Sequence, residues 1–376
     1  MHVDAYYLDF HDAPWSNLSR AKPDPRAVAE DQLKGDSVMQ RAASSALGKA
    51  GTAPCAIRLW LAPAVAHLLL FAPAASAATI DWVTVGDPGN ACEVQSQGCF
   101  GAVTDAYRIG KYEVTNGQYV EFLNAVAATD PNGVYPGLYI AQSGTSGSFT
   151  YSVAPTAEDW PVSQVSFYDA LRFANWMHNG QPTGAQSNAT TEDGAYTITP
   201  AGIAANSIVR NAGASIFLTS EDEWYKAAYY DAISTTFFDY PGASNTPMTC
   251  AQPTGAANSA NCGPALGQVA PVGSYPGSPG PYGTFDQGGN VLEWNEAAVG
   301  LHRVARGGHF FSNQPVELNA SLQTTADPLW DPPPPWAGFR LASLVPVPEP
   351  GTGLLLMFGL VGLTCRRITH CSLPLG

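Results

Sequence analysis

The sequence has few charged residues, and basic residues are the scarcest of them. Charged residues make up 13% of the 376 residues, against about 25% in an average soluble protein. Between residues 78 and 347 there are 8 Lys and Arg but 23 Asp and Glu. A nucleic-acid partner needs a basic surface to meet its phosphates. The composition therefore argues against nucleic acid and predicts an acidic protein.

The sequence also lacks paired cysteine motifs. None of its seven cysteines belongs to a C-x-x-C pair, and no cysteine lies between Cys262 and Cys365. Pairing of sequence neighbours, Cys92 with Cys99 and Cys250 with Cys262, would give two disulfides in an oxidising compartment. A zinc site is the alternative, although no histidine clusters with these cysteines in the sequence.

No apolar run reaches the roughly 20 residues that cross a bilayer comfortably, but a shorter one follows Arg58. It ends before Ala75-Ser76-Ala77. A basic residue, a short apolar stretch and an A-x-A site predict a signal peptide at residues 58–77, cleaved after Ala77 by signal peptidase. The alternative is a buried helix, which two prolines in the run disfavour. Residues 1–57 would then be an N-terminal extension, which we interpret as a mis-assigned start.

The carboxyl end carries a second short apolar stretch. The sequence Val347-Pro348-Glu349-Pro350 precedes 15 mostly apolar residues and then Arg366-Arg367. This order resembles the PEP-CTERM sorting signal, so we assign residues 344–376 to a sorting tail. The resemblance implies export by a Gram-negative bacterium, processing by an exosortase-type enzyme, and delivery to the cell surface or extracellular matrix. The tail would anchor transiently in the inner membrane, with the arginines on the cytoplasmic side.

With 37 Gly and 31 Pro, the chain is expected to be rich in loops. Helices are predicted to begin after Thr115, Ser166 and Ser220, because each is an N-cap residue followed by apolar residues at helical spacing. Strands are predicted at 80–85, 107–114, 215–218 and 304–311, and long loops at 129–160, 180–213 and 239–282. We therefore expect one α+β domain over residues 78–343.

Several motifs follow one another in the order found in a known family. They are Tyr107–Asn116, Pro161–Trp176, Leu218–Trp224, Gly283–Trp294, Arg306–Gly308 and Gly338–Arg340. Together they resemble the formylglycine-generating (sulfatase-modifying factor) family. The resemblance implies the C-type-lectin-like fold of that family, which is rich in loops and has little regular secondary structure.

The residues that carry the family's chemistry are missing. Its oxidases hold copper between two cysteine thiolates, and the matching positions here are Ser312 and Glu317. A protonated hydroxyl and a carboxylate are poor ligands for a soft metal. Copper is therefore not expected, and neither is oxidation of a substrate cysteine by this route.

The resemblance also implies a calcium site in a Gly-Gly loop. The corresponding ligands would be the Asp286 and Glu293 side chains and the carbonyls of Gly289 and Val291. Oxygen ligands of this kind suit calcium. The alternative is a tight turn in which Glu293 pairs with Arg340 or Arg306. A second family site would fall near Asn258, where a later acidic ligand is not evident.

Three further side chains border the position of the family's substrate groove: His309, Trp330 and Trp336. Aromatic rings there would stack on a sugar or a peptide; the alternative is packing at the edge of the core. A triad of Ser312, His309 and Glu317 is not expected, because residues 309 and 312 of an extended strand face opposite sides.

The sequence as a whole predicts an exported binding or structural module with a glycan or matrix ligand. The alternatives are a formylglycine-generating-type oxidase and another metal-dependent oxidoreductase with altered site residues.

Overall fold

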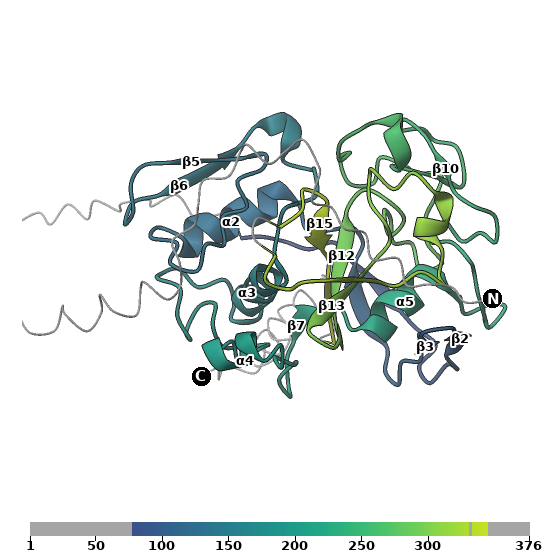
Figure 1. Ribbon diagram of the computed structural model, residues 1–376, viewed down its shortest axis with the longest axis horizontal. Coiled ribbons are helices and arrows are strands. Elements are labelled where there is room, and N and C mark those ends of the chain that lie inside the picture. Colours follow the sequence, from purple (N-terminus) through teal and green to yellow (C-terminus); the bar gives the residue numbers. More distant parts are fainter. Residues whose placement is uncertain (1–76, 331–332, 345–376) are drawn as a thin grey trace, which may run out of the picture. The chain divides into compact units, whose positions relative to one another are not determined.

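The computed structural model describes residues 77–330 and 333–344, in which short strands and a few helices are joined by long loops (Figure 1). The bulk of the predicted signal peptide and sorting tail lies outside this part. Within it the helices are α2 (Asn116–Val126), α3 (Phe167–His178), α4 (Pro200–Ala204) and α5 (Glu221–Tyr229), with 3-10 helices at Pro155–Ala157, Gly263–Ala265 and Pro315–Leu318. No helix in the described ranges is long and apolar enough to span a membrane.

The three longest helices begin where the caps predict. Thr115, Ser166 and Ser220 each accept a hydrogen bond from the backbone N–H three residues later. In each case the side chain at that later position bonds back to the cap, which closes a capping box. The box at Ser166 uses Asp169, a partner that the sequence reading did not predict. Local side-chain chemistry therefore sets all three helix starts.

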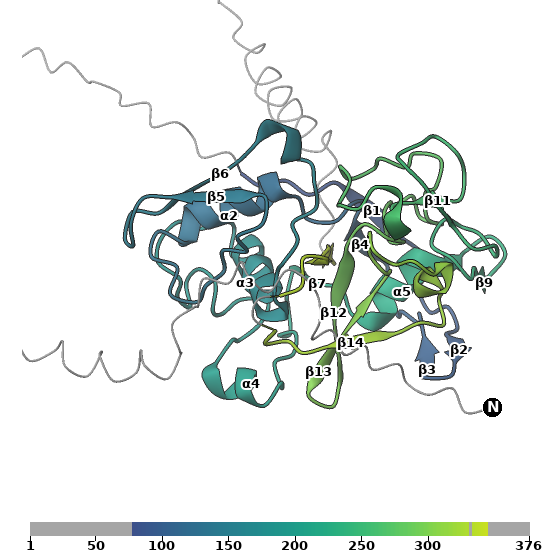
Figure 2. The ribbon, with the colours of Figure 1, turned by 45° about the horizontal axis from the view of Figure 1, so that its top comes forward.

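The strands form two four-stranded sheets and several two-stranded pairs within the described residues, of which β10–β11 is parallel. One sheet has the order β1-β4-β16-β7, formed by Trp82–Val85, Tyr107–Gly110, Leu341–Ser343 and Ile216–Leu218. The other has the order β14-β13-β12-β15, formed by Thr324–Ala326, His302–Arg306, Leu292–Val299 and Ala337–Phe339. In this second sheet β15 pairs parallel to β12, while the other neighbours are antiparallel. Two views place α2 and α3 on one side of β12 and α5 on the other (Figure 2).

Short paired strands occupy the remaining loops. They are β2 with β3 (Glu93–Gln95, Gly98–Phe100), β5 with β6 (Ile140–Ser143, Thr150–Val153), β8 with β9 (Tyr230–Asp231, Thr236–Phe237) and β10 with β11 (Thr249–Cys250, Ser259–Ala260). The hairpin β5–β6, helix α4 and the pair β10–β11 lie in segments predicted to be loops, so this prediction was wrong there. Polar and glycine-rich composition did not exclude short elements that pair locally.

The strand predicted at 304–311 is shorter than expected. It ends at Arg306, because Gly307 and Gly308 have φ of 96° and 67° and turn the chain out of the extended conformation. This turn carries the following residues away from the sheet and places them where the family site is expected.

The main core lies where α2 and α3 meet the two four-stranded sheets. Tyr119 stacks on Phe173 with 5.6 Å between ring centroids, and both rings pack edge-on against Phe339 of β15. All three side chains are fully buried. Away from this core, the disulfides Cys92–Cys99 and Cys250–Cys262 are both present, which confirms the predicted pairing.

Candidate functional site

Ser312, at the first position that matches a family cysteine, is buried in a tight turn. Its Oγ accepts a hydrogen bond from the His309 backbone N–H at 2.9 Å. The Ser312 N–H donates to the His309 carbonyl at 2.8 Å, and the Gly263 N–H donates to the Ser312 carbonyl at 2.7 Å. A Cβ on Gly308 would lie 3.0 Å from this Oγ, so the turn has little room for other contacts. The hydroxyl therefore holds the turn together.

Glu317, at the second position that matches a family cysteine, also accepts a hydrogen bond from a nearby backbone N–H. It lies in the 3-10 helix Pro315–Leu318, and its Oε1 accepts from the Gln314 backbone N–H at 3.2 Å. The carboxylate thus caps the start of that helix. Both positions that match the copper ligands of the family are occupied by side chains that satisfy nearby backbone donors.

His309 faces an aromatic neighbour and not Ser312. Its ring stacks on Trp336 with 4.9 Å between centroids and an interplanar angle of 20°. Its Nδ1 accepts from the Phe311 backbone N–H at 3.1 Å. Burial lowers the pKa of His309 to about 4, so the ring is neutral at physiological pH. The expectation that residues 309 and 312 face opposite sides of a strand was wrong, since they belong to a turn, but the ring is still not a base for Ser312.

Three rings form what we call the aromatic shelf: His309, Phe311 and Trp336. Phe311 is 40% exposed, and its ring lies edge-on to Trp336 at 6.3 Å. Phe310 is buried beneath, 4.4 Å from Phe311, and joins the shelf to a small apolar cluster. Trp330 is not among these contacts and packs instead against the main core.

The shelf is held by the backbone around β12. The Phe310 N–H donates to the Asn290 carbonyl at 3.0 Å, and the Leu292 N–H donates to the Trp336 carbonyl at 2.7 Å. The chain after β13 and the chain before β15 are thereby both bonded to the segment 290–292, where β12 begins. The sequence reading missed Phe311, although two adjacent aromatic residues after a Gly-Gly turn indicate that one of them faces outward.

Glu293, one of the predicted calcium ligands, is bound by Arg340. Both side chains are fully buried, with Arg340 Nε 2.5 Å from Oε2 and Nη2 2.6 Å from Oε1. The Trp224 indole donates to the same Oε2 at 2.7 Å. Both oxygens of the carboxylate therefore accept hydrogen bonds, and Glu293 pairs with Arg340 as in the alternative considered from the sequence. Arg306, the other partner considered, pairs with Glu221.

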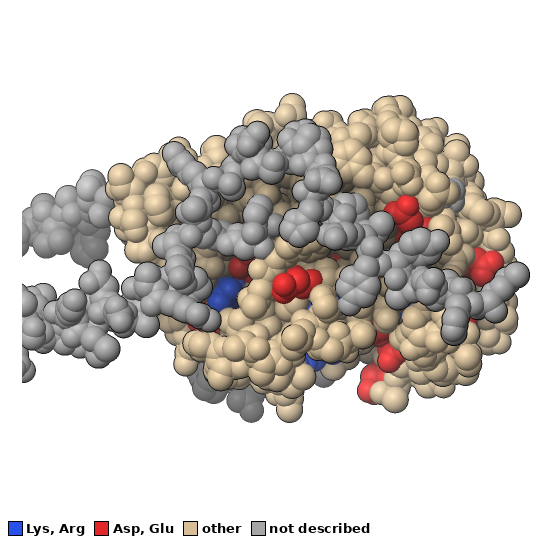
Figure 3. Space-filling model, viewed as in Figure 1, with Lys and Arg blue, Asp and Glu red and all other residues tan. Residues whose placement is uncertain are grey.

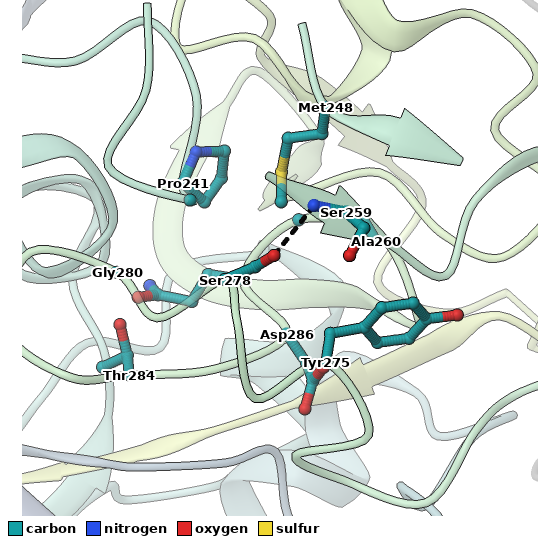
Figure 4. A pocket seen from close by; sticks show the side chains of 12 residues that line it. Pro241, Met248, Ser259, Ala260, Tyr275, Ser278, Gly280, Thr284 and Asp286 are labelled. Carbon is teal, nitrogen blue, oxygen red and sulfur yellow. Dashed lines mark hydrogen bonds between the residues drawn. The ribbon is translucent and has the colours of Figure 1, made fainter. Parts of the chain in front are cut away.

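Asp286 is partly buried, and it lines a cavity of about 10 Å³ (Figure 4). Its Oδ2 accepts from the Gly273 backbone N–H at 2.6 Å. Burial raises the pKa of Asp286 to about 6. Thr284 Oγ1 and Gln287 Oε1, on residues that line the same cavity, have no hydrogen-bond partner in the described part of the chain. The cavity has room for about one water molecule.

The contacts of Glu293 and Asp286 show how well calcium would fit the predicted site. The four-ligand set implied by the family does not fit this arrangement at Glu293, because Arg340 neutralises that carboxylate. Asn258, the weaker candidate, donates through its amide to the Thr246 and Pro247 carbonyls, and its Oδ1 has no partner among the described residues. Calcium stays a prediction that rests on Asp286 and on the carbonyls of Gly289 and Val291.

Comparison with known proteins gives two family matches and several relatives. The sulfatase-modifying factor enzyme 1-like domain matches residues 99–345, and the PEP-CTERM protein-sorting motif matches residues 346–368. A hercynine oxygenase of Mycolicibacterium smegmatis is 27% identical over 207 residues, which cover 52% of this chain and 38% of that protein. A hercynine oxygenase of Mycobacterium tuberculosis is 25% identical over 273 residues, covering 63% and 52%. The chain thus spans about half or less of the length of these relatives.

Solved structures with a similar fold include CarF, with a TM-score of 0.47 and 22% identity, covering 72% of this chain and all of that one. The variable protein 1 of Treponema denticola has a TM-score of 0.45 and 18% identity, covering 70% of this chain and 94% of that one. The family model spans more than half of the chain, and the expected α+β, loop-rich fold is confirmed. The chain belongs to the sulfatase-modifying factor enzyme 1-like family and carries a PEP-CTERM sorting motif that indicates export and processing by exosortase-type machinery.

Proposed function

We propose that this protein is a non-catalytic binding module that holds a glycan or matrix ligand on the aromatic shelf. The observation that carries the proposal is the role of Ser312. Its hydroxyl is 1% exposed and accepts the His309 N–H inside a turn. A buried group that satisfies a backbone donor is costly to recruit for another purpose. This supports a structural role at a position where the oxidases of the family carry a cysteine.

The shelf supports ligand binding. Phe311 presents an exposed ring beside the stacked pair His309 and Trp336. Exposed ring faces on a fixed backbone stack on sugars or on flat peptide groups at low entropic cost. The neutral state of His309 at physiological pH avoids the cost of desolvating a charge when a ligand covers it.

The ligand that best fits this surface is uncharged. In the part of the face that Figure 3 leaves uncovered, acidic side chains lie at several separate places. The low number of basic residues disfavours polyanionic ligands. We therefore propose a neutral glycan as the ligand. The sorting tail would deliver the module to the cell surface or extracellular matrix of a Gram-negative bacterium, after signal peptidase cleaves behind Ala77.

The alternative function is a metal-dependent oxidoreductase. The two relatives compared above are named hercynine oxygenases, which is the reason to consider it. Such an enzyme needs a cluster of metal ligands. Residues 77–330 and 333–344 hold no group of three or more His, Cys, Asp or Glu side chains that would bind a metal. The side chains at the two positions that match the family's thiolates, Ser312 and Glu317, accept backbone hydrogen bonds, which supports binding over redox chemistry.

The proposal is tested by titrating the purified, exported protein against a panel of immobilised neutral polysaccharides. We expect saturable binding that Phe311→Ala weakens about tenfold, equal to about 1.4 kcal/mol. Leu301→Ala is the matched control, because Leu301 is 72% exposed and lies beyond the opposite end of β13. Equal binding by wild type and Phe311→Ala would contradict the role of the shelf. Failure to bind any neutral polysaccharide would contradict the glycan ligand.

A further inference from the structure

Burial changes sharply between Ala77 and Ala78. Ala77 is exposed, whereas Ala78 is 4% exposed and belongs to the main core cluster. The sequence predicts that signal peptidase cleaves between these two residues. The predicted amino terminus of the mature protein is therefore a buried residue, and the fold must hold it in place once the residues before it are removed.

The side chain of Gln181 holds Ala78 through both polar groups of its backbone. The Ala78 N–H donates to Gln181 Oε1 at 2.8 Å, and Gln181 Nε2 donates to the Ala78 carbonyl at 2.7 Å. The side-chain amide thus exchanges two hydrogen bonds with Ala78, as a residue of a neighbouring β-strand would. The two residues are 103 positions apart, so the fold and not the local chain creates this contact.

The end of helix α3 positions Gln181. The Gly180 N–H donates to the Met177 carbonyl at 3.2 Å. The Gln181 N–H donates to the Trp176 carbonyl at 2.9 Å, which completes the two bonds of a Schellman motif. This motif needs one left-handed residue after the helix, and Gly180 supplies it with φ of 80°. The backbone of Gln181 is therefore fixed by the helix end.

The backbone conformation of Gln181 indicates that its side chain is needed. Its φ is 60°, in the left-handed region that glycine adopts without steric cost and that other residues rarely adopt. Such strain persists where the surrounding structure fixes it, and it often marks a functional position. The contact that requires a long amide side chain here is the pair of hydrogen bonds to Ala78.

We propose that Gln181 is the receptor for the amino terminus that cleavage behind Ala77 creates. Hydrolysis of the Ala77–Ala78 peptide bond consumes one water molecule and leaves a carboxylate on Ala77 and an ammonium on Ala78. One N–H of that ammonium keeps the hydrogen bond to Gln181 Oε1. Ala77 is exposed and lines a cavity of about 330 Å³, so its departure opens the nitrogen of Ala78 to water, which solvates the other N–H groups. This inference rests on the cleavage site in the proposed function and not on the glycan ligand.

The test begins with the mass of the amino-terminal peptide of the purified, exported protein, which should start at Ala78. The second measurement is the rate at which an aminopeptidase releases that alanine from the folded protein, because release requires local opening of the terminus. Gln181→Gly removes both hydrogen bonds and also relieves the backbone strain, so the variant should fold. We expect it to raise the release rate about tenfold or more, and Gln181→Leu to act in the same direction.

Gln142→Leu is the matched control. Gln142 is also partly buried, and its Nε2 donates to the Tyr151 hydroxyl at 3.1 Å, a contact that does not involve Ala78. This substitution should leave the release rate within about twofold of wild type.

Gln181→Glu gives a reading that a purely structural role would not give. A carboxylate beside an ammonium favours its charged form, so the pKa of the α-amino group should rise above its usual value of about 7.7–8.0. The pH dependence of labelling by an amine reagent measures this pKa.

A mature protein that starts at another residue would contradict the cleavage site and with it the proposal. A start at Ala78 with equal release from wild type, Gln181→Gly and Gln142→Leu would contradict the role of Gln181. These results do not depend on the glycan titration, so each proposal can fail alone.

Discussion

The buried ion pair between Arg340 and Glu293 gives the sharpest prediction about stability. Arg340→Met keeps most of the side-chain volume but removes the guanidinium. That group also donates to the carbonyls of Gly110 and Phe285, each at 2.9 Å. Since both partners are 0% exposed, the substitution leaves an unpaired charge in the core, which costs about 3–5 kcal/mol. Total stability in domains of this kind is about 5–15 kcal/mol, so the variant should lose a large fraction of it.

The assay is thermal unfolding followed by circular dichroism. For a domain of this size each kcal/mol lowers Tm by roughly 2–4 °C, so Arg340→Met should lower it by about 6–20 °C. The control is the double variant Glu293→Gln/Arg340→Met, which removes the orphaned charge and should recover part of the loss. A single-variant loss below about 1 kcal/mol, or a double variant less stable than the single one, would refute the assignment of a buried, charged pair.

Three further predictions concern the turn, the histidine and the disulfides. Ser312→Ala removes the acceptor of the His309 N–H and should cost about 1–2 kcal/mol in chemical denaturation; unchanged stability would show that the hydroxyl does not hold the turn. The folded-state pKa of His309 lies near 4, below its ordinary 6.5, so stability should fall as pH drops from about 6.5 toward 4, by at most about 3 kcal/mol. Asp286 acts in the opposite sense, since its raised pKa favours the folded state at low pH. The contribution of His309 is therefore the difference in the free energy of unfolding between wild type and His309→Gln, measured across this pH range. An equal pH dependence of stability in the two proteins would contradict the lowered pKa of His309. Replacing Cys250 and Cys262 by serine, 12 residues apart, should cost about 3 kcal/mol, and replacing Cys92 and Cys99, 7 apart, about 2 kcal/mol, in guanidinium titrations; a larger loss for the shorter loop would contradict this ranking.

The parts of the fold that follow from short-range chemistry were predictable. A capping serine or threonine needs a partner only three residues away, so the starts of α2, α3 and α5 could be read from Thr115, Ser166 and Ser220. The disulfides join cysteines 7 and 12 residues apart, and pairing by proximity was sufficient. The order of motifs along the chain gave the family, and the family gave the fold.

The parts that depend on distant contacts were not predictable. Asn290 and Glu113 are 177 residues apart, and only the folded chain brings them together. Glu293 had two candidate arginine partners in the sequence, Arg340 and Arg306, and the parallel pairing of β12 with β15 brings Arg340 to it. The aromatic shelf joins the turn after β13 to Trp336, and no local pattern fixes that distance. Strand length was misjudged where Gly307 and Gly308 bend the chain.

Our central proposal is that the described residues form a binding module and not a redox site, and metal content tests it most directly. The measurement is elemental analysis of the exported protein, purified without chelators and compared with a Ser312→Cys/Glu317→Cys variant prepared in the same way. The account predicts no stoichiometric copper or iron in the native protein, because Ser312 and Glu317 cap a turn and a helix. One copper or iron ion per native chain would contradict it.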